Sequence, residues 1–198
     1  MTEDTKGYIY ITGTGADPAA RQNLNDPLFT KTPSLAACMP NIRRFVSRGD
    51  YIFVISGSVP GVQQYVIGGM RVAEKLTALA AYRRFPENRL RQDADGKLLG
   101  NIPIDSRGNQ HPLDHHDPAT FADRVKNFIV GDQVVHMKTP MEVELARAQT
   151  LTKLSQIMRR RGNRVIDVMG RWSKLDSSQI GETIDWLKGI KEIAARRP

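Results

Sequence analysis

The apolar segment from Tyr51 to Ser56 constrains the fold of this chain more than any other feature of the sequence. Its residues, YIFVIS, put apolar side chains on both faces of an extended strand, because successive side chains of a strand point in opposite directions. Such a strand is expected in the middle of a sheet, covered on both sides. Gly49 is expected to end a helix just before it, and Asp50 opens the strand.

Further strands and helices are expected around this segment. Compact runs of aromatic and β-branched residues predict other strands at 7–12, about 65–74 and about 132–137. Apolar residues at helical spacing predict helices that begin near Ser34, Thr77, Pro140 and Ser177, the third ending near Arg161.

Two long polar stretches, 13–33 and 87–127, are expected to be loops. We predict an α+β fold with a core domain at residues 1–139. A helical C-terminal extension at residues 140–198 is expected to pack on it.

The charge of the chain favours a polyanionic partner. The 198 residues carry a formal net charge of +8, and neutralising phosphates releases their condensed counterions. A basic protein that uses its charge only for solubility is the alternative. The single cysteine excludes an intrachain disulfide, and no segment has the length and apolarity of a membrane span or a secretory signal. We therefore predict a cytoplasmic protein with no membrane association.

Basic side chains concentrate around the two central strands. Arginine forks suit phosphate groups, so we predict a phosphate-binding surface, although a solvated helix face explains each arginine singly. Its members are Arg43, Arg44, Lys75, Arg83 and Arg84. A second basic patch, Arg159, Arg160, Arg161 and Arg164, either complements a helix dipole or contacts backbone phosphates.

A base-binding pocket is expected where the strands end. Aromatic rings stack on nucleobases, and the ends of the strands are expected to line the pocket. The candidate residues are Tyr8, Tyr10, Tyr51, Ser56, Gly57 and Ser58, with the loop that follows Tyr10.

The candidates for catalysis lie elsewhere in the sequence. His115 or His116 would act as a general base, with Asp114 or Asp117 orienting the imidazole, and an exposed polar loop is the alternative. Cys38 is a candidate nucleophile beside arginines or else a buried apolar residue. We predict no metal and no cofactor, because the glycines after the first strand do not complete a dinucleotide-binding fingerprint.

The block LAACMPNIRRFVSRGDYIFVISGS, followed by YVIGGMRVAEKLT and AAYRRFP, resembles the nucleotide modification associated domain 2 family. The resemblance covers roughly residues 7 to 138. The order of elements is also similar to PUA-like domains of the EVE and ASCH type, which are small β-barrels with flanking helices. These resemblances imply a PUA-like small mixed barrel or sheet and a context of DNA modification or phage conflict.

The sequence is consistent with three alternative functions. The first is a protein that binds DNA, RNA or a nucleotide and recognises or handles a modified base. The second is an enzyme that acts on a nucleotide or base with His115 or His116 as general base. The third is a subunit without catalysis that docks on a protein partner, or on a second copy, through its C-terminal helices.

Overall fold

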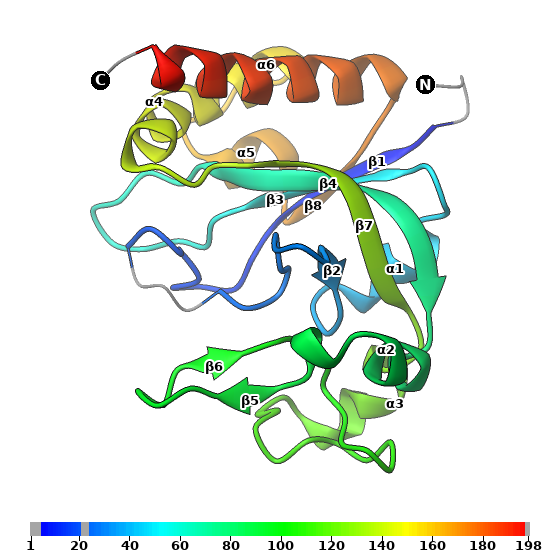
Figure 1. Ribbon diagram of the computed structural model, residues 1–198. Helices are drawn as coiled ribbons and strands as arrows, with labels where there is room; N and C mark the ends of the chain where they lie inside the picture. Colours follow the sequence, from blue (N-terminus) through cyan, green and yellow to red (C-terminus); the bar gives the residue numbers. More distant parts are fainter. Residues whose placement is uncertain (1–4, 21–23, 197–198) are drawn as a thin grey trace. The chain divides into compact units, whose positions relative to one another are not determined.

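The computed structural model describes residues 5–20 and 24–196, which form two compact units (Figure 1). The first unit comprises Met1–Leu24, Asp50–Met70 and Val134–Pro198, and the second comprises Asn25–Gly49 and Arg71–Gln133. Both are discontinuous in sequence. The predicted division at residue 139 stays a prediction.

A six-stranded mixed sheet confirms the expected α+β class. Its strands follow the order β2-β7-β4-β3-β1-β8. β1 (Gly7–Ile11) runs parallel to β3 (Tyr51–Ile55) and antiparallel to β8 (Trp172–Leu175). All five residues of β3 are buried, as expected for a strand that is apolar on both faces.

The remaining long strands were also expected, and the structure extends them. β4 (Val66–Leu76) and β7 (Phe128–His136) each pass from one unit into the other along the chain. β8 was not expected from the sequence, because its four residues, WSKL, are few and show no alternation of polar and apolar types.

Three helices belong to the first unit: α4 (Pro140–Ile157), α5 (Val165–Met169) and α6 (Ser177–Ala195). α4 and α6 each begin with a capping box, in which a side chain at the N-cap and one at the third helical position satisfy the free backbone N–H groups. An added Cβ at Gly7 would lie 2.7 Å from Ile180, so α6 approaches β1 closely here. The helix expected to reach Arg161 ends at Ile157, because the backbone turns left-handed at Arg159.

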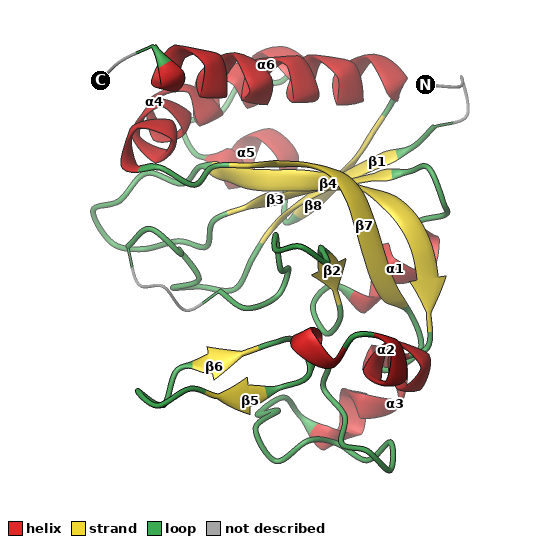
Figure 2. Ribbon diagram, in the orientation of Figure 1, coloured by secondary structure: helices red, strands yellow, loops and turns green. Residues whose placement is uncertain are grey.

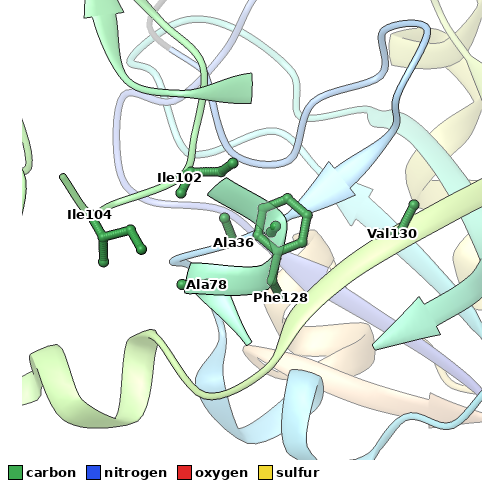
Figure 3. Close-up of a cluster of buried hydrophobic side chains, with 7 residues drawn as sticks. Ala36, Ala78, Ile102, Ile104, Phe128 and Val130 are labelled. Carbon is green, nitrogen blue, oxygen red and sulfur yellow. The ribbon is translucent and has the colours of Figure 1, made fainter. Parts of the chain in front are cut away.

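The second unit contains short helices and long loops (Figure 2). Its elements are β2 (Ser34–Leu35), α1 (Pro40–Phe45), α2 (Ala78–Arg84), η1 (Pro86–Asn88), β5 (Arg91–Gln92), β6 (Leu98–Leu99), η2 (Pro118–Thr120) and α3 (Phe121–Arg124). Figure 3 shows its apolar core, where Phe128 and Ile102 lie near Ala78 of α2 and Ala36, the residue after β2.

The helix expected from Ser34 begins only at Pro40. The backbone N–H groups of Ala36, Ala37 and Cys38 donate to the buried carboxylate of Asp26 at 2.6–2.8 Å. This carboxylate replaces the carbonyl partners that a helix would provide, so the segment stays extended. No helix in the described ranges is both long and apolar enough to cross a membrane.

Candidate functional site

A pocket of about 610 Å³ lies within the first unit, at the carboxyl ends of the parallel strands β1 and β3. This is a size typical of small-molecule sites, and the ends of parallel strands are where α/β sheets commonly bind ligands. Its walls come from the loops after β1 and β3, from α4 and from the segment around α5. The lining residues are Ile11, Thr14, Ser58, Val62, Gln63, Gln64, Arg147, Ala148, Leu151, Thr152, Asn163, Arg164, Val165, Ile166 and Arg171.

The two strand-end loops hold each other by backbone hydrogen bonds. The N–H of Gly15 donates to the carbonyl of Ser58, and the N–H of Gly57 donates to that of Ala16, both at 2.9 Å. A Cβ at Gly57 would lie 1.8 Å from the carbonyl oxygen of Gly13. Only glycine therefore permits this approach, and the loop geometry beside the pocket depends on it.

Arg147, which projects from α4, forms one wall of the pocket and makes an ion pair with a buried carboxylate. Its Nη2 lies 3.0 and 2.9 Å from the two carboxylate oxygens of Asp17, which is 1% exposed. Its Nη1 donates to the carbonyl of Gln63, and its guanidinium lies 4.6 Å from the ring centroid of Tyr65. Arg147 thus joins α4 to both strand-end loops, and Asp17 neutralises its charge.

Two other arginines line the pocket and differ in their partners. Arg164 pairs with Asp167 at 2.8 Å, in an ion pair that is largely exposed. Arg171 lies between α5 and β8, is exposed, and has no acidic partner among the residues that the structure describes. No aspartate or glutamate of the described chain lines the pocket. The pocket therefore offers a net positive charge above an apolar surface from Ile11, Leu151 and Val165.

The structure brings only part of the predicted base pocket to this cavity. Ser58 lines it, and Ser56 and Gly57 precede Ser58 in the same loop, where the Ser56 hydroxyl accepts the N–H of Tyr65. The three tyrosines do not converge there. Tyr8 and Tyr10 are buried, and the pleat places them on the face of the sheet opposite to Tyr51, which is also buried. A role for them in stacking on a base is therefore not supported by their positions.

The predicted phosphate-binding residues all belong to the second unit. Arg43 does not fit that role, because it is fully buried and its guanidinium donates to the carbonyls of Ala37, Cys38, Arg124 and Asn127. It holds the chain segments of this unit together, and helical spacing alone did not reveal its inward direction.

The other four predicted phosphate-binding residues have side chains that are at least partly exposed. Arg44 and Arg83 are exposed, whereas Lys75 donates to the carbonyl of Arg44 and Arg84 pairs with Glu74 at 2.5 Å. Whether they bind phosphate stays a prediction.

Cys38 is poorly suited to nucleophilic chemistry. Burial raises the pKa of its thiol far above the ordinary value, and the Asp26 carboxylate raises it further. The arginines nearby oppose this shift but do not outweigh it. A thiol held in its protonated form is a poor nucleophile, which contradicts the prediction of a reactive cysteine.

The histidine–aspartate cluster forms a defined pair in the second unit. His116 Nδ1 lies 2.5 Å from Asp114 Oδ1, and Arg124 Nη1 donates to Asp114 Oδ2 at 2.6 Å. Burial by itself would raise the pKa of Asp114, but hydrogen bonds from Arg124 and His116 lower it below its ordinary value. An ionised Asp114 can only accept, so Nδ1 of His116 carries the proton and Nε2 is left as the basic nitrogen.

The other members of this cluster lie outside that pair. His115 is exposed, and Asp117 caps η2 by accepting the N–H of Ala119 at 2.9 Å. His116 is half exposed, with 52% of its side chain accessible. No group of three or more potential ligands in the described residues is placed to hold a metal ion.

Sequence reasoning missed Arg147 and Arg171 as site residues. Neither belongs to a basic run, and each lies far along the chain from the loops that it joins or faces. The glycines after β1 were the available signal, because they mark a tight loop at the end of a parallel strand. No protein-family model, no curated protein and no solved structure matches this chain.

Proposed function

We propose that the chain binds a nucleotide, free or within a nucleic acid, in the pocket of the first unit. The observation that carries this proposal is Arg171, a pocket-lining cation without an acidic partner in the described chain, in a cavity that no described carboxylate lines. A phosphate provides the missing anion. A base and sugar match the remaining lining, which combines apolar side chains with the amides of Gln63, Gln64 and Asn163.

The resemblance to the nucleotide modification associated domain 2 family supports a modified base as the group recognised. It is the basis for proposing a DNA-modification or phage-conflict context. The similarity to EVE and ASCH domains is the basis for proposing a PUA-like variant of the mixed sheet, and the single cysteine is the basis for proposing a cytoplasmic location. The basic character of the chain, with a net charge of +8, agrees with a polyanionic partner.

The direct test is binding of a panel of nucleoside monophosphates to the purified protein, with a mass-spectrometric search for nucleotides that remain bound after purification. Arg171→Gln is expected to weaken binding at least about tenfold, because it removes a charge-assisted hydrogen bond to phosphate. Arg107→Gln is the matched control, since it removes one exposed arginine from the second unit that belongs to no predicted site. Equal losses in the two variants, or no binding by any monophosphate, would contradict the proposal.

A second candidate function is enzymatic and rests on the 2.5 Å contact between His116 and Asp114. A carboxylate that fixes the Nδ1 proton orients the imidazole and leaves Nε2 free to accept a proton, as a general base requires. The reaction would be proton abstraction from a nucleotide or base.

His116→Gln is expected to abolish turnover while nucleotide binding persists. His115→Gln is the matched control and is expected to retain turnover, because His115 makes no such contact. Asp114→Asn should lower the rate and shift its pH profile. Full activity of His116→Gln would exclude this role.

A further inference from the structure

The turn that ends α4 has an unusual composition for its geometry. The N–H of Arg159 donates to the carbonyl of Gln156, and the N–H of Arg160 donates to that of Ser155, at 3.1 and 3.0 Å. These two bonds define a Schellman motif, whose left-handed position is usually glycine. Here that position is Arg159, with a φ of 52°.

An arginine in this position is strained, because its Cβ crowds the following carbonyl in the left-handed conformation. Two more arginines follow, and then Gly162, whose added Cβ would lie 2.7 Å from Asp167. Glycine therefore stands where the turn approaches α5. Arginine stands at the left-handed position, where glycine would adopt the conformation with less strain. Strain of this kind recurs at functional positions.

The three arginines of this turn, Arg159, Arg160 and Arg161, are exposed. None of their guanidinium groups has an ion pair or hydrogen bond with a described residue, whereas Arg147 and Arg164 are both paired. Interaction with the helix dipole accounts for cations here only in terms of stability. It predicts no effect on a ligand.

The arginine turn lies next to the pocket along the chain. Arg161 is followed after one residue by Asn163, a lining residue, so their Cα atoms are at most about 7.6 Å apart, twice the Cα spacing of a trans peptide. Arginine has a long side chain, so this separation is short enough for Arg161 to contact a phosphate next to one held in the pocket.

We infer that the pocket takes one unpaired nucleotide of a single-stranded polynucleotide, and that the phosphates flanking it bind the arginine turn at 159–161. This rests on the proposed nucleotide site. A free mononucleotide has no further phosphates to occupy three unpaired cations outside the pocket. A base in a duplex must leave its stack to enter a cavity of this size, so an unpaired strand is the favoured ligand.

The experiment compares a nucleoside monophosphate with short single-stranded DNA and RNA oligonucleotides over a series of salt concentrations. The oligonucleotide is expected to bind at least about tenfold more tightly, with a steeper salt dependence. In the double variant Arg160→Gln/Arg161→Gln the oligonucleotide slope should fall by about 1.4, since each contact contributes about 0.7 on a single strand. Affinity for the monophosphate should not change. The DNA and RNA arms show which sugar is preferred.

The control is Lys97→Gln/Arg107→Gln, which removes two exposed charges from the second unit and should leave both affinities near wild type. Binding of the monophosphate with no gain for the oligonucleotide overturns this inference and leaves the proposed nucleotide site intact. Failure of both ligands to bind overturns both. A last experiment measures binding to vesicles that contain phosphatidylserine. If the double variant Arg160→Gln/Arg161→Gln loses vesicle binding while its oligonucleotide binding is unchanged, the turn binds a membrane surface and the inference is overturned.

Discussion

Arg147→Ala tests the reasoning about the pocket wall most directly. The change removes the partner of Asp17, a carboxylate that is 1% exposed. Among the described residues, the Asp17 carboxylate then keeps the backbone N–H groups of Ala19 and Ala20. It also removes the bond to Gln63 and the stacking on Tyr65. The buried carboxylate cannot be hydrated again unless the loop after β1 opens. We therefore expect a lower free energy of unfolding and a lower affinity for the ligand.

The expected cost is large because the carboxylate of the pair is buried and the arginine has only 17% of its side chain accessible. Breaking such a pair by removing one partner typically costs about 3–5 kcal/mol. The exposed pair between Arg164 and Asp167, where the arginine side chain is 73% accessible, provides the comparison. An exposed pair contributes about 0–1 kcal/mol. We therefore expect Arg147→Ala to lower the free energy of unfolding several times more than Arg164→Ala.

The assay is urea denaturation at pH 7, followed by tryptophan fluorescence. Both tryptophans, Trp172 and Trp186, belong to the first unit and report on its unfolding. A double-mutant cycle with Asp17→Asn isolates the coupling between the two side chains. A loss below about 1 kcal/mol for Arg147→Ala, or a coupling near zero, would refute the view that this pair holds the pocket wall.

Three further outcomes follow from single positions. Arg159→Gly should raise the free energy of unfolding by about 0.5–1 kcal/mol in urea denaturation, because glycine relieves the left-handed strain; a loss would refute the strain. Burial lowers the pKa of His136 to about 4 from its ordinary value of 6.5. The unfolded chain then binds more protons between these pH values, so stability should fall as pH is lowered through this range, and His136→Gln should flatten the decline. Cys38 should react with a thiol reagent only in denaturant, and fast labelling of the folded protein would contradict its raised pKa.

Local patterns in the sequence predicted most of the elements. The central strand at Tyr51, the second-unit helix capped by Thr77 and the long helix after Pro140 all appeared where periodicity and capping residues indicated. Errors arose where distant groups intervened. The Asp26 carboxylate accepts hydrogen bonds from the backbone of the segment that was expected to begin a helix at Ser34. Asp26 lies ten residues before Ala36, the first of these donors, so the helical pattern of the segment itself could not reveal the contact.

The site shows the same limit. The sequence predicted a base pocket at the strand ends around residues 56–58, and Ser58 lines the cavity there, while the binding of a base stays a prediction. The sequence could not show that Arg43 is buried against four carbonyls while Arg171 lines a cavity. In the sequence, each is an arginine beside an apolar segment, and nothing local distinguishes the two.

By itself, the sequence determined the class of fold and the excess of positive charge, because apolar periodicity and composition are properties of neighbouring residues. The tertiary structure decided which charges are available to a ligand. Asp17 neutralises Arg147 from 130 residues away, whereas Arg171 and the arginine turn at 159–161 have no such partner in the described chain. Pairing of charges depends on distances across the fold, and those are set only when the sheet and its helices have packed.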